Sequence, residues 1–209
     1  FVGSHCGVYI GEDGASQMGL EDIGLFRAIP DSVVLYPADH VSEEKLSICA
    51  AEHQGIVYLR TTRGAVEPIY KPNQKFHVGG SNTLESSWRD QVTIIAAGIT
   101  LVEALKAHKE LAKQGIRARV IDLYSIKPLD IATLKKAASQ TKAIITVEDH
   151  YPEGGIGEAV SAALATEGFK NPVISLSVRK LPMSGKPAEL LAYEVIDAAA
   201  IAETAKNCI

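Results

Sequence analysis

Cysteine and long apolar runs are scarce in this chain. Its 209 residues include three cysteines, an odd number at spacings that match no zinc-binding pattern. We therefore expect reduced thiols in a cytoplasmic protein instead of a disulfide framework. No apolar run approaches the length of a membrane-spanning helix, so we expect no membrane partner.

An excess of positive charge is also missing. The 21 lysines and arginines are outnumbered by 25 aspartates and glutamates, and the net charge is −4. Nothing in this balance favours nucleic acid as a partner. The hydrophobic content of 46% is typical of a globular protein with room for one large domain or two small ones. The chain opens on Phe1 without a methionine, so we expect a fragment or one half of a split protein.

Residues 1–17, FVGSHCGVYIGEDGASQ, are the stretch around which the chain is organised. Glycines recur among polar side chains, which indicates a backbone that turns often and can approach a ligand closely. Apolar residues at helical spacing then predict a helix from Ser16 to Ala28. A polar loop that leads into a helix N-terminus favours anions and polar ligands.

Single residues of this loop allow two interpretations. His5 is either a structural or a binding histidine, and Asp13 is either a turn residue or a ligand contact. Cys6 is either a nucleophile or a small filler beside a ligand site, and we favour the filler because no adjacent base is specified.

Strand and helix patterns alternate after the loop. We expect strands at 32–36 and 56–60, with a helix at 42–52 between them that Ser42 caps. This alternation predicts a parallel sheet, whose ligands lie beyond the carboxyl ends of the strands. His5, Asp13 and Arg63 all fall at such ends, which is the reason to group them.

The alternation of strands and helices is interrupted once and then continues to the end of the sequence. A proline, a glycine pair and polar residues at 71–88 predict a linker, with some strand character near 76–78, between a unit at 1–70 and a unit at 89–209. Strands are expected at 92–97, 118–123, 142–147 and 173–178, and helices at 101–114, 130–140 and 197–207. A further helix is expected after the glycines at 154–157, ending near Glu167. The expected fold class is α/β, with two three-layer units built on mainly parallel sheets.

Two further motifs could indicate a cofactor or metal site, but we prefer a structural interpretation for each. The glycine-rich run at 153–160, EGGIGEAV, lacks the full dinucleotide-binding pattern, so close strand–helix packing is favoured. The run at 147–150, VEDH, holds a histidine and two acids, but successive side chains of an extended chain point to different sides. We therefore assign no metal site.

Taken as strings, several segments resemble the transketolase family. The loop string SHCGVYIGEDGASQ is similar to the substrate funnel of its pyrimidine-binding domain, and Gln17 resembles the animal-type branch. The strings YPAD, LRTTR, IKPLD, TVEDHYPEGGIGEAV and RKLPMSGKPAELL extend the resemblance through the C-terminal domain, at 36–39, 59–63, 126–130, 146–160 and 179–191.

The resemblance implies transfer of a two-carbon ketol unit between sugar phosphates in the pentose phosphate pathway. It implies that His5, Asp13 and Arg63 bind substrate and that Gln17 approaches thiamine diphosphate. The family's sites for the diphosphate and a divalent metal (Mg or Ca), and its catalytic glutamate, lie in segments absent from these residues. We therefore assign no catalytic residue, and expect inactivity without the missing N-terminal segments or a second subunit, in a dimer.

Two alternatives remain. The chain could be a non-catalytic dimerisation module, although an interface needs none of the four residues named above. It could instead belong to another thiamine-diphosphate enzyme, similar to a 2-oxoacid dehydrogenase β subunit or to deoxyxylulose-phosphate synthase.

Overall fold

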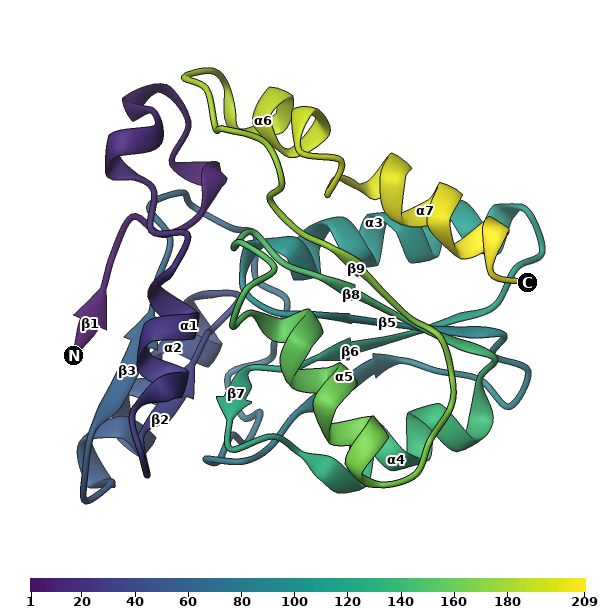
Figure 1. Ribbon diagram of the computed structural model, residues 1–209, viewed down its shortest axis with the longest axis horizontal. Coiled ribbons are helices and arrows are strands. Elements are labelled where there is room, and N and C mark those ends of the chain that lie inside the picture. The colour runs from purple at the N-terminus through teal and green to yellow at the C-terminus, as the bar shows by residue number, and fades with distance from the viewer.

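A computed structural model describes residues 1–209 as two sheets flanked by helices (Figure 1). The first sheet has the strand order β1-β3-β2-β7. Its strands β1 (Val2–Gly3), β3 (Val57–Arg60) and β2 (Val33–Leu35) are parallel, and β7 (Ser125–Lys127) is antiparallel to β2. A strand from the second half of the chain therefore completes the sheet of the first half.

The second sheet has the order β4-β6-β5-β8-β9. Only β4 is antiparallel to its neighbour. The strands are β4 (Asn82–Glu85), β6 (Ala118–Asp122), β5 (Val92–Ala96), β8 (Ala143–Val147) and β9 (Val173–Leu176). The expected α/β class with mainly parallel sheets is confirmed. The strand character expected near 76–78 is wrong, because the next strand after β3 begins at Asn82.

Helices cover both faces of the second sheet (Figure 1). Helices α3 (Ile99–Lys113) and α7 (Ala198–Asn207) lie on one face, and α4 (Ile131–Gln140) and α5 (Ile156–Thr166) lie on the other. Every residue of β5, β6 and β8 is buried, as expected for parallel strands covered on both faces. No helix of the structure combines the length and the apolar character that a bilayer crossing requires.

The helix predicted from Ser16 to Ala28 is wrong in its first half. The segment instead forms short 3-10 helices η1 (Val8–Asp13) and η2 (Ala15–Gln17), and α1 (Asp22–Ala28) begins later. Gly19 pairs with the loop through a bridge to Cys6, and its carbonyl accepts the amide of Gly7 at 2.9 Å. This pairing holds the backbone extended where a helix was expected.

The N-cap of α2 (His40–Glu52) is Asp39, not Ser42 as predicted. The Asp39 carboxylate accepts the amide of Ser42 at 2.8 Å, and the Ser42 hydroxyl accepts the amide of Asp39 at 3.0 Å. The two residues form a reciprocal capping box. Ser42 is therefore part of the cap, as its residue type suggested, but it is the third residue of the helix and not the N-cap.

The two halves of the chain share an apolar core. One cluster joins Cys6, Ile23 and Tyr36 of the first half to side chains of β5, β6 and α5 in the second half. The remaining helix, α6 (Pro187–Tyr193), packs against η1. The N-terminal loop is therefore held by the second half of the chain.

Candidate functional site

The candidate site lies where β1 and β3 end side by side. Gly3 is the register partner of Arg60, and the amide of Thr61 donates to the carbonyl of Gly3 at 2.8 Å. The amide of Cys6 in turn donates to the carbonyl of Thr61 at 3.2 Å. Residues that follow the two strands consequently leave the sheet at the same edge, as parallel pairing requires.

Asp13 and Arg63 meet at this edge. The Arg63 guanidinium donates from Nη1 to Oδ2 of Asp13 at 2.5 Å, across 50 positions of sequence. The two side chains are 55% and 43% exposed, so the pair is open to solvent and to ligands. Because it is exposed, the pair contributes only about 0.5 kcal/mol to folding, and both groups remain free for other partners.

His5 and Gln17 are exposed near the two ends of the same loop. Nδ1 of His5 lies 2.7 Å from the Ser4 hydroxyl, and the His5 backbone is left-handed at φ 63°. Such a conformation is costly outside glycine and is often found at binding sites. Gln17 ends η2. No hydrogen bond or ion pair joins His5 or Gln17 to Asp13 or Arg63, so their binding roles remain predictions.

Two glycines of the loop allow its backbone to approach the second half of the chain. Gly7 has φ 72°, and a Cβ there would lie 1.7 Å from Oδ2 of Asp149. Gly14 has φ 78°, and a Cβ there would lie 2.4 Å from the Ser184 hydroxyl oxygen. Close approach, as well as turning, explains why glycine occupies these positions.

A buried ionic network lies beneath the edge, and sequence reasoning missed it. The Arg60 side chain is fully buried and contacts Oδ2 of Asp22 and Oδ1 of Asp149, each at 2.8 Å. Its guanidinium also lies 4.5 Å from the centre of the Tyr36 ring. The available signals were an arginine at the end of an apolar strand and the unexplained acids of VEDH.

Burial and the surrounding hydrogen bonds shift the pKa values of the buried groups in opposite directions. Burial raises the pKa of Asp22, but Arg60 and the hydroxyl of Tyr58, which donates to Asp22 at 2.6 Å, outweigh it and leave that pKa below its usual value. Burial raises the pKa of the Cys6 thiol to about 12. Cys6 is also almost fully buried, and its thiol donates to the carbonyl of Thr61 at 2.9 Å, so the structure favours a small packing residue over a nucleophile.

The three polar residues of VEDH have separate partners. Glu148 accepts the amides of Ile156 and Gly157 at 2.5 and 2.9 Å, Asp149 binds Arg60, and Nε2 of His150 accepts the amide of Gly24 at 3.4 Å. The carboxylate of Glu148 thus occupies the first turn of α5, where a dinucleotide would place its pyrophosphate. Close strand–helix packing is the better interpretation of the glycine-rich run.

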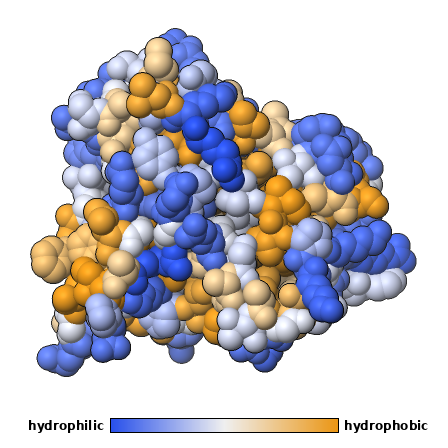
Figure 2. Space-filling view, viewed as in Figure 1, coloured by the Kyte–Doolittle hydropathy of each residue, from blue (hydrophilic) through white to orange (hydrophobic).

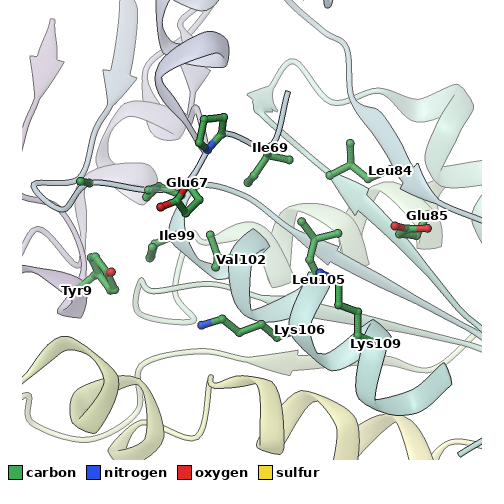
Figure 3. A pocket seen from close by; sticks show the side chains of 13 residues that line it. Tyr9, Glu67, Ile69, Leu84, Glu85, Ile99, Val102, Leu105, Lys106 and Lys109 are labelled. Atoms are coloured by element: carbon green, nitrogen blue, oxygen red, sulfur yellow. The ribbon is translucent and has the colours of Figure 1, made fainter. Parts of the chain in front are cut away.

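Two cavities lie near the loop. A polar cavity of about 270 Å³ adjoins Arg63, between residues 37–43 and 61–66, and the buried hydroxyl of Thr62 has no partner. A larger cavity of about 580 Å³ lies between α3, β4 and residues 65–69 (Figure 3). Its lining is mostly apolar, and none of the candidate site residues lines it.

Two family models match this chain. The model of the transketolase pyrimidine binding domain matches residues 1–68, and that of the transketolase C-terminal domain matches residues 81–201. The chain belongs to the transketolase family. The family expected from the sequence strings is therefore confirmed.

Curated relatives agree. Human transketolase is 50% identical over 208 residues, which cover 99% of this chain and 33% of that protein. Bovine transketolase-like protein 1 is 52% identical over 191 residues, which cover 91% of this chain and 32% of that protein. The chain thus spans about a third of the length of the curated transketolases it matches.

Solved structures also agree. One described as a split gene transketolase, inactive beta4 tetramer, is 33% identical with a TM-score of 0.88, and the match covers 99% of this chain and 64% of that one. Transketolase from Campylobacter jejuni has a TM-score of 0.78 at 20% identity, over 99% of this chain and 31% of that one. The second match shows the fold alone.

Transketolases imply thiamine diphosphate and a metal ion. This chain has no group of three or more His, Cys, Asp or Glu side chains placed to hold a metal ion. The guanidinium of Arg60 is fully buried between Asp22 and Asp149 and has no free face for a diphosphate. These residues therefore do not form a diphosphate and metal site by themselves.

Proposed function

We propose that this chain is part of a transketolase that transfers a two-carbon ketol unit from a ketose phosphate to an aldose phosphate. The enzyme would act in the cytoplasm, in the pentose phosphate pathway. Membership of the family supports the reaction class. The observation that carries the proposal is the exposed contact between Asp13 and Arg63 at the edge where β1 and β3 end.

Arg63 binds the phosphate group of the sugar in this proposal. Its guanidinium is planar and permanently charged, and it can donate two parallel hydrogen bonds to phosphate. A phosphate carries more charge than the Asp13 carboxylate, so it competes for the same donors. Asp13 is then free to accept a hydrogen bond from a sugar hydroxyl, and His5 contacts the sugar phosphate beside it.

Other segments complete the site. Thiamine diphosphate and a divalent metal, Mg or Ca, bind mainly to residues outside these 209, and Gln17 approaches the thiamine. The short span relative to curated transketolases supports this division. Assembly with a second subunit, as a dimer, is part of the proposal. The similar structure of a split gene transketolase, described as an inactive tetramer, is compatible with a chain that needs a partner for activity.

Complementation tests the proposal. The 209-residue chain is mixed with thiamine diphosphate, magnesium, xylulose 5-phosphate and ribose 5-phosphate, with and without a second chain that supplies the remaining transketolase domains. We expect turnover only in the mixture of both chains. Turnover by the single chain would refute the need for other segments. Turnover with pyruvate but not with sugar phosphates would indicate another thiamine enzyme, and no turnover by the complemented mixture would favour a dimerisation module.

A further inference from the structure

A second polar cavity lies between the two halves of the chain, away from the candidate transketolase site. It measures about 530 Å³, and its wall includes Arg27 of α1, Ser161 of α5, Ser175 of β9, and Arg179. On the face shown in Figure 2, strongly hydrophilic side chains gather over the region between α1 and α5. None of the four predicted binding residues lines this cavity.

Two arginines face the cavity from different segments. The guanidinium of Arg27 is anchored by one nitrogen, Nη1, which donates to the carbonyls of Gly154 and Gly155, the latter at 3.0 Å. Its other nitrogens have no protein partner. The side chain of Arg179 makes no hydrogen bond or ion pair and is exposed. Two arginines with free donors are a typical arrangement for binding a phosphate group.

One unpartnered hydroxyl lies at the wall of the cavity. Ser175 lines the cavity, and its hydroxyl oxygen is buried without a hydrogen-bond partner. A buried polar group without a partner costs free energy, so a ligand oxygen that reaches this hydroxyl would recover part of that cost.

One acidic side chain lines the cavity, and a second, Glu148, is close enough to Arg27 to act on it electrostatically. Glu158 lines the wall, and its carboxylate accepts the amide of Gly154 at 2.7 Å. The amides of Ile156 and Gly157 are already taken by Glu148, so the first turn of α5 adds no donor there. Recognition of an anion therefore depends on Arg27, Arg179 and the serine hydroxyls, with Glu158 opposing it.

We infer that this cavity binds a phosphorylated small molecule, at a site separate from the one proposed for sugar transfer. Arg27 and Arg179 contact the phosphate group, at the wall that Ser161 and Ser175 line. The volume of about 530 Å³ leaves room for an organic group beyond the phosphate. The inference does not depend on the proposed function.

Titration of the 209-residue chain with inorganic phosphate tests the inference. Backbone amide shifts are followed by NMR, and a second titration uses ribose 5-phosphate. We expect saturable shifts at Gly157, Ser161 and Ser175. R179Q should weaken phosphate binding about tenfold, because it removes a charge-assisted contact. E158Q should strengthen it, because it removes the opposing charge. Neither side chain is part of the core, so both variants are expected to fold.

The matched controls are K170Q and R63A. Lys170 is an exposed cation that does not line the cavity, and Arg63 belongs to the proposed transketolase site. Both variants should bind inorganic phosphate at the cavity as the unaltered chain does. Shifts confined to other regions, or equal affinity of R179Q, E158Q and the unaltered chain, would overturn the inference. If R63A leaves the ribose 5-phosphate shifts at residues 61–66 unchanged while R179Q weakens phosphate binding at the cavity, only the proposed transketolase role of Arg63 is at fault.

Discussion

Arg60 and Asp149 form an ion pair at 2.8 Å in which neither side chain is exposed, although 89 positions separate them in sequence. Arg60 ends the β3 strand of the first sheet, and Asp149 follows the β8 strand of the second. The pair therefore connects the edge that carries Arg63 to the second half of the chain. Removing this buried pair should lower the stability of the fold. Removing the exposed pair of Asp13 and Arg63 should change it little.

Asp149→Ala is expected to reduce the free energy of unfolding by about 3 kcal/mol. The substitution leaves the buried charge of Arg60 with Asp22 as its one remaining carboxylate, and loss of a buried partner typically costs this much. Urea unfolding followed by circular dichroism measures the change. Asp13→Ala is the matched control, because its ion pair is exposed, and it should cost less than about 1 kcal/mol. Equal costs for the two variants would contradict the structural role of the buried pair.

Gly7→Ala should destabilise the chain more than Gly115→Ala. Both glycines have positive φ, at 72° and 78°, so each substitution carries a backbone cost of about 1 kcal/mol or more, and the ψ of 177° at Gly7 is almost exclusive to glycine. A Cβ at Gly115 meets nothing within 4 Å, whereas one at Gly7 would meet the carboxylate of Asp149. The clash should add about 2 kcal/mol for Gly7 alone. Thermal unfolding of the two variants gives the comparison, and a smaller loss at Gly7 would show that the loop does not lie against Asp149.

Cys6 should resist alkylation in the folded chain. Its thiol is buried and its pKa is raised to about 12, so almost no thiolate exists at pH 8. Cys49 and Cys208 are half-buried and should react faster with iodoacetamide. Mass spectrometry of digested samples locates the modified residues, and unfolding in guanidinium chloride should make all three react. Rapid modification of Cys6 in the folded chain would restore the nucleophile interpretation.

Asp122 should make the chain less stable as pH rises. Burial raises the pKa of its carboxyl from 3.8 to about 8, against the hydrogen bond that Tyr70 donates to it. Between these values the folded chain binds the proton more tightly than the unfolded chain does. Stability contributed by this group is therefore full below about pH 4 and is lost as pH approaches 8.

Asp122→Asn should remove this part of the pH dependence. Urea unfolding at several pH values compares the two chains, and their difference isolates Asp122 from the other titrating groups. The variant should gain stability relative to the unaltered chain as pH rises from 4 to 8. A difference that does not change with pH would show that Asp122 is charged in the folded chain.

The sequence predicted the grouping of exposed residues at the edge of the sheet better than the pairing of buried charges beneath it. Strand and helix periodicity placed Asp13 and Arg63 beyond the carboxyl ends of parallel strands, and the two side chains do meet at that edge, where η1 packs against α6 of the second half. The partner of Arg60 was unpredictable, because Asp149 lies in another unit and no local pattern relates them. The pairing of Arg60 with Asp149 is decided by how the two units pack together in the folded chain.

Local competition explains the errors at helix starts. Ser42 and Asp39 are both good capping residues, and the choice between them depends on which backbone amides are free. The apolar spacing before α1 was helical, but pairing between Cys6 and Gly19 made the extended backbone more favourable. Tertiary hydrogen bonds outweighed the local preference in that segment.

The most direct measurement is kcat/KM for xylulose 5-phosphate with the complemented enzyme carrying Arg63→Ala. We predict a loss of about thirtyfold, because a charge-assisted contact to phosphate is worth about 2 kcal/mol. The melting temperature of the variant should not change. The control is Arg117→Ala, which removes an exposed arginine directly before β6 and should leave kcat/KM unaltered. Unaltered kcat/KM for Arg63→Ala would contradict the proposal that this edge of the sheet binds the sugar phosphate.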